Sequence, residues 1–555
     1  MREVGYEKVS SLYDRGVRFN SGIDLYETVE NSERFFIGDQ WHGVETNGNP
    51  APVYNFLKRV VLFQVAKVCS ESFAMQVEPL AVTQDYDTAE LEKICDVVIR
   101  QFDSLIERNK LVSKMREFVR NAAVDKDACF YSWFDPSIKT GQTAKGDIVT
   151  DVIENTRVLF GNPTVREVQE QPYIIIPLRW EVEKAKRVAK ANGQNTDNIK
   201  PDKEENASEY DNMTDNKVTV LLYFAKDYET GTIWSGKYTK DCVIEKLKDT
   251  KLELYPIVWM NWEYRQDCYH GCSLIEQLIP NQLFYNRGWA MIWRSLMTSA
   301  FPKYVYNRTL LKQWDSGIGR AIAVDGGELN NVAKIIEPAP ISPQVSQLME
   351  LSLDTTQNLM GASDAALGDT RPDNTSAIIA LQRAADAPLE IVRRNVYQAM
   401  EDLAYIYKDM MRVYYGERYV RMKPFTKEQM AKPPLGMELP DEPMVQPFDF
   451  SVLEDVPLSL KVNVGASSYW SEIAMAQTLD NLLINSKIDI IDYLERLPEG
   501  RILRRQELVD KLKGQQAQML NPTGGGPITP EGPPEITGGG GYNEVARALN
   551  ETGVV

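Results

Sequence analysis

The chain has 555 residues, of which 43% are hydrophobic and 10% aromatic, so it can bury a substantial core over roughly three or four domain-sized units. Its formal net charge of −17, from 62 basic and 79 acidic residues, argues against a protein that grips DNA through a broad basic face. Six cysteines make no disulfide framework and no stretch approaches the roughly 18 apolar residues of a membrane span, so we expect a soluble intracellular protein.

Helical patterns dominate up to residue 130. "DLYETVENSERFF" and "PVYNFLKRVVLFQVAKVCSESF" are two such segments, and apolar residues fall at helical spacing in the second. The stretch "RFFIGDQWHG", residues 34–43, combines aromatic side chains, a Gly-Asp turn and a histidine. Such a cluster suits a cofactor pocket, a catalytic site or a packing anchor at the end of a helix.

Strands come next. Alternating apolar residues over 148–180 predict strands, and a helix follows from near Glu181. Residues 190–217 have almost no large apolar side chains and many charges, so we expect a mobile loop there. Strands resume and continue through "LYPIVWMNWEYR". Up to residue 270 we therefore expect one α+β domain with a long disordered insertion.

The sequence becomes more helical from residue 273. Residues 273–300 predict a helix that is reset at Pro280, a residue suited to a first helical turn. A compact segment of strands with one short helix, "TLLKQW", follows. A second helix is expected over 342–360, and after it comes a loop of glycine, small and polar residues.

The longest helical signal extends from Ala377 to about Tyr415. Its apolar residues are spaced by three or four, which gives one continuous stripe, and a kink is expected at Pro388. A helix of this length is hard to bury inside one compact domain and suits an assembly. Strands and a further helical block follow. The chain ends in "NPTGGGPITPEGPPEITGGGG", a low-complexity tail that we expect to be disordered.

One motif imitates a phosphate-binding loop. In "GTIWSGKY", residues 231–238, two glycines and a lysine have P-loop spacing, but Tyr238 stands where Ser or Thr would bind magnesium. The flanking residues also predict a hairpin turn and a returning strand, whereas a P-loop joins a strand to a helix. The motif therefore gives no support for an ATPase.

The two histidines do not form a recognisable site. No motif joins His42 to His270, and "CYHGC" at 268–272 lacks the second ligand pair that a structural zinc site usually has. No nucleophile-elbow, zinc-protease or dinucleotide-binding signature is present. We therefore expect no catalytic residue, no metal and no cofactor, in a protein that is not an enzyme.

Three segments, taken in order, resemble the portal proteins of tailed bacteriophages, the head-to-tail connectors. They are "ERFFIGDQWHG" with the helix after it, "GCSLIEQLIPNQLFYNR" and "GDTRPDNTSAIIALQ", and the resemblance spans approximately residues 25–510. It implies an α+β, portal-type subunit with an α/β wing, a two-helix stem, a small α/β clip, a long kinked helix and a helical crown. The implied boundaries are wing 1–271 and 416–470, stem helices 272–299 and 342–360, clip 300–341, tunnel loop 361–375, long helix 376–415, crown 471–514 and disordered tail 515–555.

The resemblance implies a homo-oligomeric ring, commonly of twelve subunits, at one vertex of the capsid. Double-stranded DNA would pass through it without sequence specificity. The implied partners are the major capsid and scaffolding proteins, the terminase and a neck or adaptor protein, with no membrane contact. Such a protein belongs to the virion and assembles in the host cytoplasm. An acidic chain suits a conduit, because each phosphate that a protein neutralises adds affinity and therefore friction.

The resemblance also assigns roles to particular residues. Phe35, Phe36 and Trp41 become fold anchors, and His42 becomes an incidental neighbour of them. The clip residues expected to meet the terminase and later the neck are Lys303, Tyr304, Lys312, Trp314, Asp315 and Arg320. The tunnel-loop residues expected to face DNA are Gly361, Ser363, Asp364, Gly368, Asp369, Thr370, Arg371, Asp373 and Asn374.

Two other classes of protein stay open. A DNA-packaging ATPase-nuclease or another nucleic-acid-processing enzyme would need an intact P-loop. Another structural virion protein would assemble its helices in a different way. Arg501, Arg504 and Arg505 either contact packaged DNA or form a solvated helix face, and the second interpretation is favoured.

Overall fold

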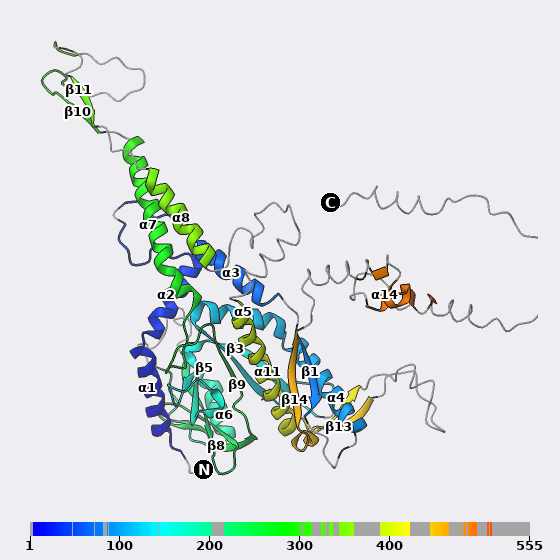
Figure 1. Ribbon diagram of the computed structural model, residues 1–555. Coiled ribbons are helices and arrows are strands. Elements are labelled where there is room, and N and C mark those ends of the chain that lie inside the picture. The colour runs from blue at the N-terminus through cyan, green and yellow to red at the C-terminus, as the bar shows by residue number, and fades with distance from the viewer. Residues whose placement is uncertain are drawn as a thin grey trace, which may run out of the picture. The chain divides into compact units, whose positions relative to one another are not determined.

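The computed structural model divides the chain into two compact units, residues 1–465 and 466–555 (Figure 1). Each unit has a hydrophobic cluster of its own. The residues that the structure describes are 4–46, 48–70, 73–80, 86, 88–142, 144–202, 216–300, 303–313, 324–326, 328, 332–336, 343–359, 389–421, 445–464, 479, 482–483, 487–496, 508–509 and 511–512.

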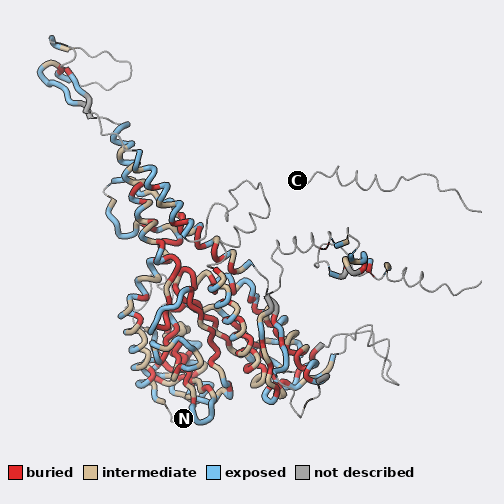
Figure 2. The backbone as a smooth tube through the Cα atoms, in the orientation of Figure 1, coloured by how far each residue is buried: buried red, intermediate tan, exposed pale blue. Residues whose placement is uncertain are grey.

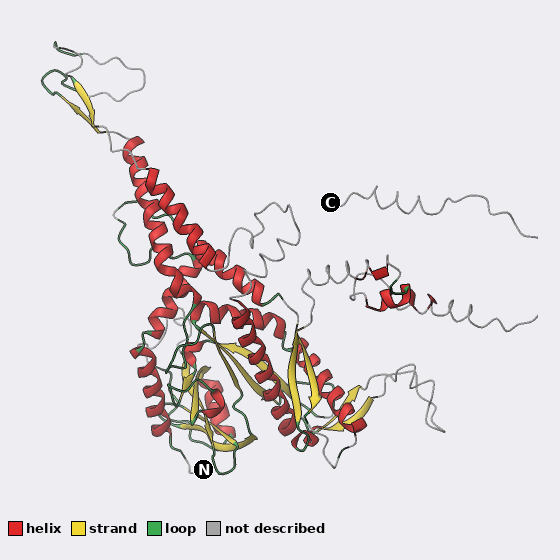
Figure 3. Cartoon of the chain, in the orientation of Figure 1, coloured by secondary structure: helices red, strands yellow, loops and turns green. Residues whose placement is uncertain are grey.

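The two largest sheets of the first unit are antiparallel and lie among helices, so the mixed α+β class is confirmed (Figure 3). One sheet has the strand order β3-β2-β9, and the other has the order β4-β5-β6-β7-β8. The strands are β2 (Asp127–Asp135), β3 (Asp147–Ile153), β4 (Leu159–Phe160), β5 (Tyr173–Glu181), β6 (Lys217–Lys226), β7 (Ile233–Tyr238), β8 (Val243–Leu252) and β9 (Ile257–Asn261).

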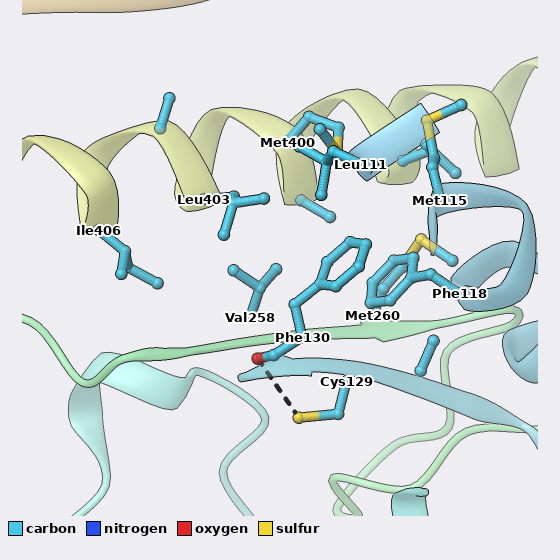
Figure 4. Packing of buried hydrophobic residues seen from close by; sticks show 14 of the residues in the cluster. Leu111, Met115, Phe118, Cys129, Phe130, Val258, Met260, Met400, Leu403 and Ile406 are labelled. Atoms are coloured by element: carbon cyan, nitrogen blue, oxygen red, sulfur yellow. Dashed lines mark hydrogen bonds between the residues drawn. The ribbon is translucent and has the colours of Figure 1, made fainter. Parts of the chain in front are cut away.

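Helix α11 (Leu389–Tyr414) packs on the three-stranded sheet and runs through the main core. Leu403 of this helix points towards Val258 of β9 and Phe130 of β2 (Figure 4). Phe130 also stacks on Phe118 of the neighbouring helix α5 (Leu111–Asp125), with ring centroids 4.1 Å apart. The apolar stripe predicted for this segment is therefore the face that the helix buries.

Further helices surround this core. The α4–α5 pair ends at Asp125, directly before β2 begins, which places the end of α5 beside the start of the central strand of the sheet. The helices are α1 (Tyr6–Gly22), α2 (Leu25–Ile37), α3 (Phe56–Val68), α4 (Thr88–Arg108), α5 (Leu111–Asp125) and α6 (Val182–Ala191), with the short 3₁₀ turns η1 (Asn155–Arg157) and η2 (Val168–Glu170).

Strands near residue 460 return to pair with strands from the first hundred residues. β14 (Leu458–Val464) runs antiparallel to β1 (Phe73–Pro79) along its whole length. β12 (Glu417–Arg421) pairs with β13 (Val445–Asp449), and the 3₁₀ turn η5 (Phe450–Glu454) follows β13. The first unit is therefore one body built from both ends of residues 1–465.

Helices α7 (Leu274–Ala300) and α8 (Pro343–Leu359) lie side by side. Gly288 lies against Met349, and Asn281 Nδ2 donates a hydrogen bond to Thr356 Oγ1 at 3.2 Å. Between these two contacts the residue number falls on α7 and rises on α8, so the two helices are antiparallel. β10 (Lys303–Tyr306) and β11 (Ala333–Ile336) form a hairpin in the segment between them. Figure 2 shows that the paired helices are mostly exposed, whereas α11 and the central strands are buried.

The predicted reset at Pro280 is wrong, because α7 is one continuous helix that contains this proline. The helix begins two turns earlier, where Ser273 Oγ accepts a hydrogen bond from Glu276 N at 3.0 Å and caps it. Leu274, Ile275 and Leu278 of the first turns are buried. Capping and burial together outweigh the roughly 3 kcal/mol that an internal proline costs.

The short helix expected over "TLLKQW" is absent from the described part of that segment, residues 309–313. The backbone turns there, because Asn307 O accepts hydrogen bonds from Leu310 N and Leu311 N. The Asn307 side chain also accepts from Thr309 N at 3.0 Å, a local bond that competes with helix formation.

The predicted mobile loop at 190–217 is wrong for residues 190–202. Helix α6 continues to Ala191, and Ile199 is 1% exposed in a small hydrophobic cluster. Asp202 accepts hydrogen bonds from Arg179 Nη1 at 2.6 Å and Thr219 N at 2.9 Å, which fixes this segment to β5 and β6. The sequence obscures this packing because one buried isoleucine stands among polar residues.

Several predicted segments lie outside the described residues. These are the loop 361–375, the first part of the long helix with Pro388, and the tail 515–555. In the second unit, α14 (Ile490–Arg496) packs Ile491 and Leu494 against Val509. Arg501, Arg504 and Arg505 are outside the described residues as well. Among the helices that are described, none has both the length and the hydropathy needed to cross a bilayer.

Candidate functional site at the base of the paired helices

The motif "GTIWSGKY" is the second strand of a hairpin. Asp227 N donates to Thr232 O at 2.9 Å across the turn, and Tyr238 is fully buried in β7. Lys237 Nζ lies 2.7 Å from Glu245 Oε2, so the lysine forms an ion pair within the sheet. A strand followed by another strand cannot present the backbone amides of a P-loop to a phosphate, and the predicted hairpin is confirmed.

A cavity of ≈ 390 Å³ lies between α11 and the segment that contains η2. Burial raises the pKa of Asp402 in its wall, and Gln398 Nε2 donates to this carboxyl at 3.0 Å. The described residues that line the cavity include no histidine, serine or cysteine. This lining therefore offers no paired nucleophile and base of the kind that covalent catalysis uses.

His42 is exposed to solvent, whereas His270 is packed in the interior. His42 is about half exposed, with Nδ1 3.4 Å from Asp39 Oδ2. His270 is buried, and its Nε2 lies 3.2 Å from Asn20 Oδ1. Cys268 beside it is buried too, which raises the pKa of its thiol. No group of three potential metal ligands occurs within the described residues.

Asp127 holds the segment that leads into α7. This fully buried carboxylate accepts hydrogen bonds at Oδ1 from Gly271 N at 2.7 Å and from Asn261 Nδ2 at 2.6 Å. Its Oδ2 lies 2.6 Å from His270 Nδ1. Lys126, the preceding residue, extends Nζ to within 3.3 Å of Glu276 Oε2 in the first turn of α7. The start of β2 therefore fixes the start of α7.

A buried network of amides joins α7 to the stretch 34–43. Asn286 Nδ2 donates to Gln40 Oε1 at 2.6 Å, and Gln282 Nε2 donates to Asn286 Oδ1 at 2.9 Å. Gln282 also bridges the backbone before α3, donating to Tyr54 O at 2.8 Å and accepting from Leu57 N at 3.2 Å. Gln282 and Asn286 are four residues apart on α7, so they face the same way. Each of the three buried side chains is therefore hydrogen-bonded within the protein.

The aromatic residues of that stretch pack beside this network. Phe35 and Phe36 are buried in the main core, and Trp41 Nε1 donates to Pro52 O at 3.0 Å. Asn55 caps α3 by accepting from Lys58 N, and its Nδ2 donates to the carbonyls of Phe35 and Phe36 at 3.2 and 3.1 Å. The end of α2 and the beginning of α3 are thereby tied together under α7.

A partly buried charge cluster links α2 to α5. Arg120 forms paired hydrogen bonds with the Glu33 carboxylate, one of them at 2.6 Å, and its Nη1 lies 3.9 Å from Asp125 Oδ2. Burial, followed by the charge of Glu33, raises the pKa of Asp125 to about 8. Its Oδ1 is buried and has no hydrogen-bond partner among the described residues. The residue after it, Lys126, has a φ of 81°, which is uncommon for a side chain with a Cβ.

A sequence model of the phage P22-like portal proteins matches residues 107–429, which is more than half of the chain. The chain belongs to the phage P22-like portal protein family. No curated protein sequence gives a match. The resemblance to phage portal proteins drawn from three sequence segments is thus confirmed, and the family is a structural one. The matched range includes Asp127, His270, Gln282 and Asn286, whereas Gln40 lies before it.

The other residues singled out in the portal protein's sequence fall mainly outside the described regions. All nine tunnel-loop residues do so, as do Trp314, Asp315 and Arg320 of the clip. Lys303 and Tyr304 begin β10, and Lys312 is exposed with Nζ 2.8 Å from Asp325 Oδ2. The clip contacts and the tunnel loop therefore both stay predictions.

Sequence patterns missed the residues that the structure joins at the base of α7. Gln40, Asp127, Gln282 and Asn286 come from three distant segments, and no local motif links them. One signal was available, since Gln282 and Asn286 are amides at (i, i+4) spacing on either side of the apolar Leu283, Phe284 and Tyr285. Buried amides at that spacing favour a partner elsewhere in the fold.

Proposed function

We propose that this portal protein forms a ring at one capsid vertex, through which double-stranded DNA enters during packaging and leaves later. In this proposal α7 and α8 are the stem, the first unit without them is the wing, and the β10–β11 hairpin belongs to the clip. The clip meets the terminase during packaging and the neck afterwards, and the loop 361–375 faces the DNA. The portal family match supports the portal assignment.

The exposed apolar surface of the stem helices is the observation that carries the ring. Met291, Trp293 and Leu296 of α7 are 65, 45 and 54% exposed, and Leu348 and Leu351 of α8 are 55 and 60% exposed. Burial of each such side chain is worth about 1.5–3 kcal/mol. Exposed patches of this kind mark surfaces that other proteins cover, and subunits on both sides in a ring would cover them.

The net acidity of the chain supports a role as conduit. A charge of −17 on each subunit gives a ring a large negative field, which opposes tight binding of phosphates. Arg371 is the only cation among the residues proposed to face DNA, beside the carboxylates Asp364, Asp369 and Asp373. Short polar side chains in such a loop let DNA slide past.

Electron microscopy of the purified full chain tests the ring directly. We expect rings with a central hole in negative stain, and their rotational averages give the copy number. Sheets, fibres or monomers at every protein concentration would contradict the proposal and favour another structural virion protein. A nucleotide-hydrolysis assay on the same sample tests the enzyme alternative, and we expect no turnover above that of a buffer blank.

Deletion of residues 363–373 tests the tunnel loop. The deletion leaves α7, α8 and both described cores unchanged, so rings are expected to form as in wild type. Packaging of DNA into proheads, or its retention afterwards, is expected to fall. A replacement of the same length made of glycine and serine separates loss of the side chains from loss of loop length. Normal packaging and retention with both variants would show that this loop does not act on DNA.

A further inference from the structure

The charges of the paired helices are divided between them by sign. Apart from Glu276, which pairs with Lys126, the charged residues of α7 are Arg287 and Arg294. Those of α8 are Glu350 and Asp354. All four are exposed, and no ion pair within the described part of the chain includes any of them. Helix α7 therefore presents an unpaired row of arginines and α8 an unpaired row of carboxylates.

The two rows emerge on opposite faces of the helix pair. Gly288 and Met349 mark the sides on which α7 and α8 face each other. At about 100° per residue, the arginines lie about 100–120° from Gly288 around α7, in the direction of falling residue number. The carboxylates lie about 100–140° from Met349 around α8, in the direction of rising number. The two helices are antiparallel, so when both are viewed along the same axis, residue numbers rise clockwise around one helix and anticlockwise around the other. The arginines and the carboxylates therefore lie on opposite faces of the pair.

Each face also carries exposed apolar side chains. By the same count of angles, Phe284, Met291 and Leu348 lie on the face that holds the arginines, whereas Trp293 and Leu296 lie on the face that holds the carboxylates. The first face is therefore apolar with a basic edge, and the second is apolar with an acidic edge. Two different, complementary faces on one chain suit a head-to-tail contact between copies. Such contacts close into a ring when the rotation from one copy to the next divides a full turn evenly.

The heights of the charges along the helices also agree. The Gly288–Met349 and Asn281–Thr356 contacts fix the register of the pair, and in this register Arg287 is level with Glu350. Asp354 is four residues, or about 6 Å, further along α8. Neighbouring copies in a ring are related by rotation, and rotation about an axis parallel to the helices leaves every residue at the same height along that axis. It brings Arg287 of one copy level with Glu350 of the next, while Arg294 is level with Pro343, which has no charge.

We infer that neighbouring copies of this chain join head to tail through the paired helices, with Arg287 on α7 of one copy bonded to Glu350 on α8 of the next. The inference rests on the proposed ring and names its contact. The apolar side chains supply most of the buried area. The charge pair sets the register and opposes contacts between like faces, which would bring arginine against arginine or carboxylate against carboxylate.

Charge reversal in the full chain tests this contact. Arg287→Glu and Glu350→Arg are each expected to lower the fraction of protein in rings at least about tenfold, measured by sedimentation and negative stain. The double variant Arg287→Glu/Glu350→Arg is expected to recover rings. Arg294→Glu, which makes the same charge change on the same helix face, and Arg187→Glu on α6 are matched controls expected to assemble nearly as wild type.

Mixing the two single variants gives the sharpest result. In a ring where they alternate, the side chain changed by Arg287→Glu meets the one changed by Glu350→Arg at one contact. At the next contact the unchanged Arg287 meets the unchanged Glu350, so every contact is attractive. Two variants that fail alone are therefore expected to form rings together, and a folding defect in either variant cannot produce that recovery. A mixture that stays unassembled overturns the inference even if both single variants lose their rings.

The outcomes separate this inference from the proposed function. Rings in wild type together with equally abundant rings of Arg287→Glu would leave the portal ring in place and overturn the Arg287–Glu350 contact. Absence of rings in wild type at every concentration would overturn the ring and the contact together. Recovery in the double variant and in the mixture would establish both.

Discussion

Asn286 Nδ2 donates a hydrogen bond to Gln40 Oε1 at 2.6 Å, although 246 residues separate them in sequence. Asn286 lies on α7, whereas Gln40 ends the aromatic stretch that follows α2. Both side chains are buried and cannot reach water. If this hydrogen bond were broken, the donor and the acceptor would therefore be left without partners. The bond fixes α7 against the stretch 34–43.

Replacement of Asn286 by alanine should therefore lower the free energy of unfolding. The change leaves Gln40 Oε1 without its donor and removes two hydrogen bonds at Asn286 Oδ1, from Gln282 and from Tyr54 N. We expect a loss of about 2–3 kcal/mol, measured from the urea midpoint of dissociated subunits. Asn358→Ala, on the exposed surface of α8, is the matched control and should change stability by less than about 0.5 kcal/mol. Equal losses of unfolding free energy in both variants would show that the amide network does not stabilise the fold.

Asp127→Asn is expected to loosen the segment that leads into α7. The buried carboxylate accepts from Gly271 N and Asn261 Nδ2 and faces His270 Nδ1, so an amide would direct an NH₂ group at a donor. A buried donor left without its acceptor costs about 1–3 kcal/mol. Thermal unfolding measures the loss, and limited proteolysis is expected to cut near residue 271.

Asp267→Asn makes the same chemical change at an exposed position in the same segment. Its φ of 55° is one that asparagine adopts readily, so its melting temperature should stay close to wild type. If Asp127→Asn melts no lower than this control, the carboxylate does not hold the base of α7.

Local sequence patterns predicted the helices and the hairpin well. A helix was expected over 342–360, where α8 lies. The spacing of apolar residues located the described part of α11, because this helix buries one apolar stripe. The turn at Asp227 was visible in its glycine and polar residues. Pro280 misled the prediction because its local cost is offset by burial of Leu274, Ile275 and Leu278, which depends on tertiary packing.

The contacts at the base of α7 were not predictable for a different reason. Gln40 meets Asn286, and Asp127 meets His270 at a separation of 143 residues, so no window of sequence contains both partners. A buried polar residue looks the same in sequence as an exposed one until its partner is known. The family resemblance supplied the order of the parts, whereas the hydrogen bonds that join those parts come only from the fold.

The stability of the first unit is expected to fall with rising pH because of Asp125. Burial and the charge of Glu33 raise the folded pKa of Asp125 to about 8, from an ordinary value of 3.8. The folded state therefore keeps a proton that the unfolded state releases, so stability decreases as pH rises from about 4 to about 8. Glu154 also raises the pKa of Asp125, whereas Arg120 lowers it.

Asp125→Asn keeps the neutral form at every pH and measures this effect. Its melting temperature relative to wild type should rise steadily between pH 5 and pH 8. Asp267→Asn, on the exposed surface, should show no such trend. A difference between Asp125→Asn and wild type that is constant over this range would show that Asp125 is ionised in the folded protein at neutral pH.

Gly288 lets α7 and α8 approach each other. A Cβ at this position would lie 2.8 Å from Met349 Sδ, at the end of a flexible side chain. Gly288→Ala should therefore be nearly neutral, because a small shift of Met349 is offset by the roughly 1 kcal/mol gain in helix propensity. Gly288→Leu overfills the contact and should cost about 1–3 kcal/mol in thermal unfolding, and Met349→Ala in the same chain should restore part of it. If Gly288→Leu melts like Gly288→Ala, this face of α7 does not meet α8, and the register that aligns Arg287 with Glu350 is wrong.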